Sequence, residues 1–267
     1  MKISSDIDYH TGNIDACGSV TITGSVMPNF VVKAAGDIVI QGNIESAYVE
    51  AKGSLKAAGI FGKTEATIVK AGKSLEANFL QNCHVTAKSD IHIRDSVVNS
   101  EVSSETQIDV SGGKGAVVTS RLMAGSHIVA SVLGSHGENP LQLIAGVNPK
   151  LWQGLERQKR ELNFTRRVAL RGSYKRRRPD NALERNISVR QSKKRNYASV
   201  LERSVARREK NILSDLVLRK ELPYVKASQK VYANVHIKIG PYRFKTTEES
   251  DGKIFQPDLQ HAIIVAT

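Results

Sequence analysis

Apolar and small residues recur in a fixed order along the first half of the chain. Each repeat has an apolar residue, any residue and a small residue, and two apolar residues at alternate positions begin four residues later. The pattern occurs seven times, and its small residues are Ala16, Ala34, Ala51, Ala71, Ala87, Ser104 and Ala124. Their positions advance by 18, 17, 20, 16, 17 and 20 residues. So short a period is typical of a solenoid, in which each coil buries its inner face by stacking on its neighbours.

The period also selects the kind of solenoid. Two helices and a turn need more than about 30 residues, whereas alternating apolar positions fit strands with one buried face. Val, Ile and Thr are frequent in these runs, and Gly, Ser, Asn and Asp separate them. The absence of a Leu-x-x-Leu-x-Leu pattern and of an asparagine ladder argues against leucine-rich repeats, and the lack of strict six-residue spacing argues against a left-handed hexapeptide helix. Residues 1–147 are therefore predicted to form a right-handed parallel β-helix of about seven coils.

The strand pattern stops at Asn148-Pro149. Asn is a favourable N-cap and Pro fits the first helical turn, so a helix is expected to begin here. Apolar residues then recur at helical spacing at Leu151, Leu155, Leu162 and Ala169, with Gln158 and Thr165 in the intervening core positions. A second helical stretch, from 181 to 222, has its apolar stripe at Ile187, Tyr197, Leu201, Val205, Ile212 and Leu216. We predict a long antiparallel coiled-coil hairpin over residues 148–222.

Strand patterns return after Pro223. Residues 231–240 alternate between apolar and polar, and shorter apolar runs follow at 242–246, 254–255 and 262–265. An open end of a β-helix presents unpaired strand edges. Residues 223–267 are therefore predicted to complete or cap the β-helix, which makes the fold mainly β with a helical insertion.

The positive charge is concentrated in the predicted hairpin. Residues 150–221 contain 22 Lys and Arg against 8 Asp and Glu, whereas the remaining residues contain 17 against 18. The clustered basic residues are Arg166, Arg167, Lys175, Arg176, Arg177, Arg178, Lys193, Lys194, Arg195, Arg207 and Arg208. A solvated helix face normally mixes the two signs of charge. We expect these clusters to contact an acidic protein partner.

Other interpretations of the basic segment stay open. Clustered Lys and Arg also neutralise phosphates, so a nucleic-acid-binding module is the alternative. Tyr174 and Tyr197 are the interleaved aromatic residues, and no nucleic-acid recognition motif is present. Anionic lipid headgroups and a solvated face without any partner are further possibilities.

The residues offer little for catalysis or metal binding. Asp37, Asp90 and Asp109 contribute one carboxylate to each of three coils, whereas a calcium site needs several converging oxygens. The seven histidines are scattered, without metal-ligand spacing, and Cys17 and Cys83 lie in different coils. The glycine-rich run 112–115 lacks the spacing of a phosphate-binding loop. We predict no catalytic residue, no metal site and no cofactor; a β-helix carbohydrate-active protein is the second alternative.

The chain contains no apolar run long enough to span a membrane and no apolar signal core at its N-terminus. These features predict a cytoplasmic protein without a membrane span. Self-association, through the hairpin or through the ends of the coils, is a further possibility.

Several segments resemble the bacterial flagellar assembly protein A (FapA) family. Their order and spacing carry the resemblance, and they are residues 11–14, 35–47, 59–62, 112–115, 128–135 and 146–149. The resemblance implies a β-helix interrupted by a coiled coil. It further implies a non-enzymatic scaffold that acts through protein–protein interaction in flagellar assembly or polar placement, concentrated at the flagellated cell pole. Family members usually have a further domain before the β-helix, so the chain is expected to be a fragment.

Overall fold

The computed structural model describes residues 1–63, 67–137, 140–171, 182–217 and 221–267. The chain forms two compact units. The first comprises Met1–Pro149 and Arg219–Thr267, and the second, called the helical unit below, comprises Lys150–Leu218.

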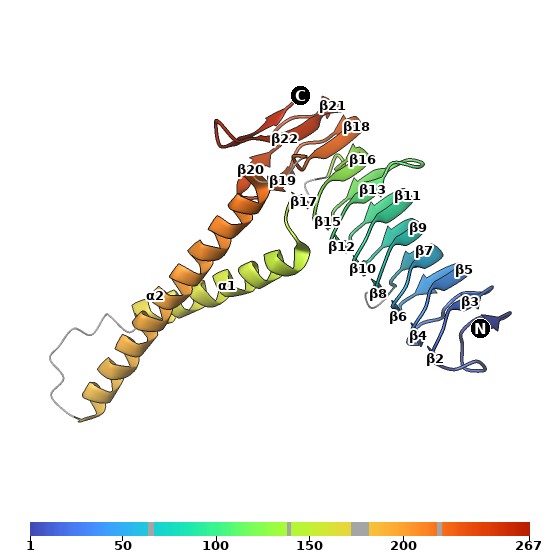
Figure 1. Ribbon diagram of the computed structural model, residues 1–267, viewed down its shortest axis with the longest axis horizontal. Helices are drawn as coiled ribbons and strands as arrows, with labels where there is room; N and C mark the ends of the chain where they lie inside the picture. Colours follow the sequence, from blue (N-terminus) through green and yellow to red (C-terminus); the bar gives the residue numbers. More distant parts are fainter. Residues whose placement is uncertain (64–66, 138–139, 172–181, 218–220) are drawn as a thin grey trace. The chain divides into compact units, whose positions relative to one another are not determined.

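The first unit is a β-solenoid of about seven turns, built from two long sheets that run along its axis (Figure 1). The first sheet contains β1 (Lys2–Ile3), β3 (Val20–Ile22), β5 (Ile38–Glu45), β7 (Leu55–Phe61), β9 (Leu75–Gln81), β11 (Ile91–Val98), β13 (Ile108–Val110), β14 (Ala116–Val118), β16 (Ile128–Leu133), β18 (Val225–Val231), β21 (Ser250–Asp251), β22 (Ile254–Asp258) and β23 (Ile263–Ala266). The second sheet contains β2 (Ile14–Ala16), β4 (Val31–Ala34), β6 (Tyr48–Ala51), β8 (Thr67–Ala71), β10 (Cys83–Ala87), β12 (Glu101–Ser104), β15 (Arg121–Ala124), β17 (Leu141–Ala145), β19 (Val235–Ile239) and β20 (Tyr242–Lys245).

The repeat of the sequence maps directly onto these strands. Each small residue ends a strand of the second sheet, and the apolar pair that follows lies in the first sheet. Equivalent residues stack in register, as Ala71 does on Ala51 and Ala87. The apolar residues of the repeat are buried, because every coil covers the inner face of the next. The prediction of a β-solenoid is confirmed.

The structure contains an eighth repeat that the sequence pattern did not reveal. Ala145 stacks on Ala124 and is buried. The first apolar residue of the pair should then stand at 149, but Pro149 begins a helix instead. Val225 and Ala227 in β18 supply the missing pair, in register with Ile128 and Ala130. The helices are therefore inserted at one corner of a coil.

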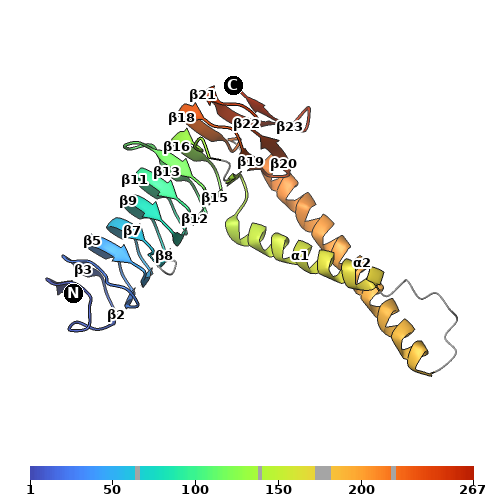
Figure 2. The ribbon, with the colours of Figure 1, turned by 180° about the vertical axis from the view of Figure 1, so that it is seen from behind.

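The C-terminal segment both continues and closes the solenoid. Strands β18 and β19 add to the two sheets in parallel. Strands β20, β21 and β22 pair with them in the antiparallel sense, and β23 pairs antiparallel with β22 (Figure 2). The change of direction ends the parallel stacking of coils.

One corner of the coils uses the left-handed backbone conformation. The positive φ angles at this corner are 69° at Asn29, 41° at Ser46, 50° at Asn82, 45° at Asn99 and 49° at Thr119. The Asn99 side-chain amide donates to Asn82 Oδ1 at 2.6 Å. The Asn99 side chain therefore bonds to the equivalent asparagine of the preceding coil. Asn tolerates this conformation well, because its short side chain bonds locally.

Thr119 is the β-branched member of this corner. We expect Thr119→Asn to raise the free energy of unfolding by about 1 kcal/mol, because a β-branched residue is strained at positive φ. Chemical denaturation of the whole chain measures the change. Thr119→Val is the control, because it keeps a β-branched side chain and should not raise the free energy of unfolding. A Thr119→Asn protein that is no more stable than the parent would contradict the prediction.

The helical unit contains α1 (Pro149–Arg171) and α2 (Ala182–Val217). The buried apolar residues of these helices are Trp152, Leu155, Leu162, Ala198, Leu201, Val205, Ile212 and Leu216. Two predicted positions differ: Leu151 is 62% exposed and Tyr197 is 48% exposed. Their neighbours Trp152 and Ala198 are buried instead. Ile187 and Ala169 lie outside the side chains that the structure describes.

Candidate partner-binding surface on the helical unit

Polar side chains join the two helices. Lys159 Nζ lies 2.6 Å from Glu209 Oε1, and Arg166 Nε donates to Glu202 Oε1 at 2.8 Å. Each of these contacts joins a basic residue of α1 to an acidic residue of α2. Two of the few acidic residues of this segment are therefore occupied between the helices.

A third polar contact involves Tyr197. Its hydroxyl donates to Glu161 Oε1 at 2.6 Å. This hydrogen bond, together with the negative charge of Glu161, raises the pKa of the Tyr197 phenol. Tyr197 thus contacts α1 through its hydroxyl, although its side chain is not among the buried residues of the helices.

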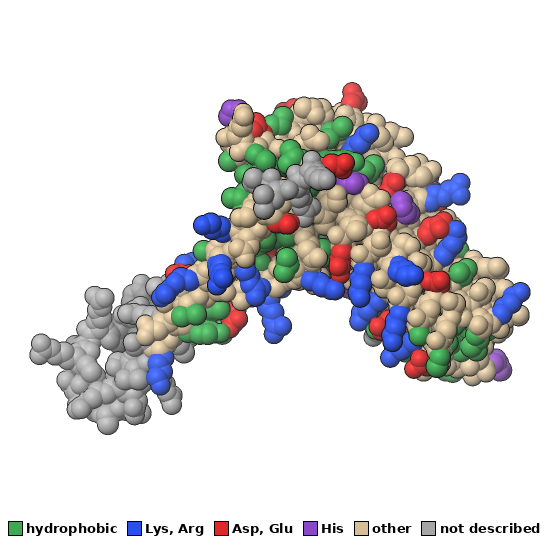
Figure 3. All heavy atoms as spheres, in the orientation of Figure 1, with side chains coloured by type: hydrophobic (Ala, Val, Ile, Leu, Met, Phe, Trp, Pro, Cys, Tyr) green, Lys and Arg blue, Asp and Glu red, His purple; other side chains and the backbone are tan. Residues whose placement is uncertain are grey.

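Further basic side chains of the two helices, among those that the structure describes, are exposed to solvent. Figure 3 shows Lys and Arg side chains, in blue, along the helical unit. Eight of them are exposed and make no salt bridge within the described residues: Arg157, Arg160, Arg167, Lys193, Arg203, Arg207, Arg208 and Lys210. Unpaired charge of one sign is a surface that attracts an acidic molecule.

The predicted contact residues fall into three groups. Arg167, Lys193, Arg207 and Arg208 belong to the exposed, unpaired set, whereas Arg166 is paired with Glu202. The predictions for Lys175, Arg176, Arg177, Arg178, Lys194 and Arg195 lie outside the described side chains. Arg157, Arg160, Arg203 and Lys210 were not among the predicted contact residues, and all but Arg160 lack an adjacent basic residue in the sequence. Their signal is a spacing of three or four residues from another basic residue, which places the two together on one face of a helix.

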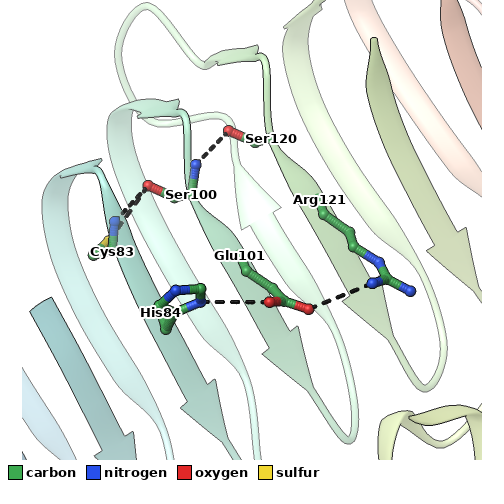
Figure 4. A network of polar contacts seen from close by, with 6 residues as sticks. All are labelled: Cys83, His84, Ser100, Glu101, Ser120 and Arg121. Atoms are coloured by element: carbon green, nitrogen blue, oxygen red, sulfur yellow. Dashed lines mark hydrogen bonds and ion pairs between the residues drawn. The ribbon is translucent and has the colours of Figure 1, made fainter. Parts of the chain in front are cut away.

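The solenoid carries polar ladders on its outer surface (Figure 4). His84 Nδ1 lies 3.4 Å from Glu101 Oε2, and Arg121 Nη1 lies 3.6 Å from Glu101 Oε1. These residues occupy equivalent positions in β10, β12 and β15. The outward orientation predicted for His84 is confirmed by its exposure. Glu101 and Arg121 pair opposite charges between two neighbouring coils.

Two corner carboxylates accept hydrogen bonds from the neighbouring coil, one from its backbone and one from a side chain. Asp37 Oδ1 accepts from the Ser54 N–H at 2.7 Å, and Asp90 Oδ1 accepts from the Thr106 hydroxyl at 2.5 Å. Across the described ranges, no group of three or more His, Cys, Asp and Glu is arranged to hold a metal ion. The described helices include none that is long and apolar enough to cross a membrane.

Cys83 and two serines form a buried ladder beside the outer one (Figure 4). The Cys83 N–H donates to Ser100 Oγ at 3.3 Å, and the Ser100 N–H donates to Ser120 Oγ at 3.2 Å. Burial raises the pKa of the Cys83 thiol to about 11. Cys17, by contrast, is exposed.

The two thiols should therefore differ in reactivity. At pH 8 we expect an aromatic disulfide reagent to modify one thiol per folded chain, because Cys83 is both buried and protonated. In denaturant both thiols should react. Cys17→Ser should abolish the reaction of the folded protein; a Cys17→Ser chain that reacts as fast as its unfolded form would contradict the prediction.

The same thiol makes stability depend on pH. The pKa of Cys83 is raised in the folded chain from 9.0 to about 11, so the unfolded chain loses this proton first as the pH rises. The free energy of unfolding therefore falls between pH 9 and about pH 11, and the loss at the upper pH is about 2 kcal/mol. Denaturation midpoints of the parent and of Cys83→Ala should converge over this interval. If the difference between the two midpoints stays the same across this pH interval, the raised pKa of Cys83 is contradicted.

The fold and this surface define a class: a β-solenoid of about seven turns with two inserted helices. A family model, the Flagellar Assembly Protein A beta solenoid domain, matches residues 1–258. The chain belongs to the flagellar assembly protein A family, which confirms the resemblance and relates the protein to flagellar assembly. No curated protein and no solved structure matches the chain.

Proposed function

We propose that the chain is a non-enzymatic scaffold in flagellar assembly, whose helical unit binds an acidic protein partner. The observation that carries the proposal is the set of eight exposed basic side chains without a salt bridge among the described residues. The solenoid contributes a rigid mount, since each coil is bonded to the next along both sheets. Family membership supplies the link to flagellar assembly.

The architecture serving this role is a right-handed β-helix over residues 1–147, a basic coiled-coil hairpin over 148–222, and C-terminal strands over 223–267. The buried residues of α1 and α2 support the coiled coil, because they are spaced three, four or seven apart. In this proposal the protein acts in the cytoplasm, concentrated at the flagellated pole. A fluorescent fusion in flagellated cells tests that placement, and uniform fluorescence would contradict it.

Charge reversal tests partner binding. The variant Arg157→Glu/Arg160→Glu/Arg167→Glu changes three exposed, unpaired residues of α1. The matched control is Lys52→Glu/Lys73→Glu/Lys88→Glu, which makes the same charge change at exposed corners of the solenoid. The intact chain and both variants are used to retain proteins from an extract of flagellated cells, once without and once after nuclease treatment.

We expect the intact chain and the control variant to retain the same acidic protein, and the α1 variant to lose it. Equal retention by both variants would contradict the proposal. If the intact chain instead retains nucleic acid, and protein retention disappears after nuclease treatment, the nucleic-acid alternative replaces it.

A further inference from the structure

One face of α1 combines charge with an exposed aromatic ring. Gln153, Arg157, Arg160, Phe164 and Arg167 follow at steps of four, three, four and three residues, and all are exposed. This spacing places them on a single face of the helix. We call these five residues the α1 outer stripe. Phe164, at 68% exposure, is one of the most exposed large apolar residues of the described chain.

The α1 outer stripe points away from α2. Leu155 and Leu162, on the other side of α1, are buried. Lys159 and Arg166, which contact α2, belong to that side as well. Glu161, which also contacts α2 through Tyr197, lies between the buried side and the stripe and is not one of its five residues. The stripe is therefore not part of the packing between the two helices, and Phe164 has no aromatic or cation–π contact within the described residues.

Arginines lie on both sides of the ring along the helix. Arg160 precedes Phe164 by four residues and Arg167 follows it by three, and neither has a salt bridge within the described part of the chain. An exposed ring between unpaired arginines is the composition of a binding hot spot, in which aromatic and Arg side chains contribute most of the affinity. The stripe from residue 153 to residue 167 is about 21 Å long at 1.5 Å per residue.

We infer that the α1 outer stripe binds an acidic amphipathic helix of the partner protein. An apolar side chain of that helix packs on Phe164, and carboxylates three or four residues to either side of it meet Arg160 and Arg167. A straight stripe fits a helix, because helical side chains three and four positions apart also lie on one line. The inference rests on the proposed function and specifies the chemistry of the partner.

Two neighbouring features favour a peptide over a lipid surface or a nucleic acid. A helix that lies in a membrane interface has a continuous apolar face, whereas the apolar face of α1 is buried and its outer stripe has one ring. Glu156 borders the stripe one turn before Arg160. Its carboxylate interrupts the positive charge beside the stripe, whereas a surface that follows a nucleic-acid backbone is a continuous basic groove.

The experiment uses two synthetic peptides of identical Leu and Glu composition and the full chain. In the first peptide the leucines follow helical three- and four-residue spacing; in the second the order is scrambled. Phe164→Ala tests the ring. Val200→Ala is the matched control, because Val200 is 57% exposed on α2 and lies outside the α1 outer stripe. Binding is measured by fluorescence anisotropy at low ionic strength.

We expect Phe164→Ala to weaken binding of the amphipathic peptide by about tenfold, the effect of losing one hot-spot side chain. Val200→Ala should leave it unchanged, and the scrambled peptide should bind both variants alike. If both peptides bind every variant equally, the inference fails while charge-driven partner binding survives. If neither peptide binds the parent, the inference fails, and the charge-reversal experiment on the cell extract decides the proposed function separately. Phe164-dependent binding to phosphatidylserine vesicles without peptide binding would overturn the inference in favour of a lipid.

Discussion

Replacing Ala87 by Leu is expected to lower the free energy of unfolding by about 3 kcal/mol, because overpacking a well-packed core is costly. Ala87 is buried and stacks between Ala71 and Ser104. Neighbouring strands lie only about 4.8 Å apart, so three additional carbon atoms at this buried position must displace the side chains packed around it. Urea denaturation of the whole chain, followed by circular dichroism, measures the loss.

Thr86→Leu is the matched control for this substitution. Thr86 is adjacent in the same strand, points outward and is exposed. The same introduced side chain should change stability there by only a few tenths of a kcal/mol, as surface substitutions usually do. Equal effects at the two positions would show that the interior of the solenoid accommodates a large side chain at this corner.

The solenoid could be predicted from the sequence because each coil repeats the same packing problem. A small residue recurs wherever two strands approach at the corner, and that constraint is visible without any long-range information. The last coil lacks this constraint and has a large residue at the same position. Ile239 stacks on Ala145 at the small-residue position. It lies where antiparallel β20 follows rather than another parallel coil, so the restriction to small residues no longer applies.

The interrupted repeat could not be predicted in the same way. Ala145 carries the small-residue signal, but Val225 and Ala227, which complete its coil, lie about 80 residues further along the chain. No local pattern connects the two segments. Their pairing depends on the sheets already formed by the preceding coils, which offer a free edge in register with Ile128.

The candidate surface was predictable in composition but not in detail. The excess of Lys and Arg is evident from the sequence, whereas the pairing of each residue depends on the neighbouring helix. Arg166 is adjacent to Arg167, yet Glu202 pairs with the first and leaves the second exposed. Phe164 gave no signal, because an apolar residue in a helix is ordinarily assigned to the core.

Two glycines follow small residues of the repeat at positions where the backbone passes close to the preceding coil. A Cβ atom on Gly72 would lie 2.0 Å from the Lys52 carbonyl oxygen, and one on Gly125 would lie 1.9 Å from the Glu105 carbonyl oxygen. These glycines end the two 20-residue steps of the repeat. Lys88 and Glu105 occupy the equivalent position after shorter steps. The longer coils therefore return to the stack by a closer backbone approach that only glycine permits.

Gly72→Ala and Gly125→Ala are each expected to destabilise the chain by about 3 kcal/mol, the upper part of the range for overpacking. The obstructing atom is backbone in both cases, so relief requires the coils to separate and lengthens the hydrogen bonds from Gly72 N–H to Ala51 O and from Gly125 N–H to Ser104 O. Gly18→Ala is the control, because a Cβ atom there would meet nothing within 4 Å. That substitution should leave stability unchanged or raise it by about 0.5 kcal/mol through the unfolded chain. Denaturation midpoints of the three variants measure these effects. If Gly72→Ala and Gly125→Ala unfold at the same midpoint as Gly18→Ala, the close backbone approach is not the reason for glycine at the end of a 20-residue step.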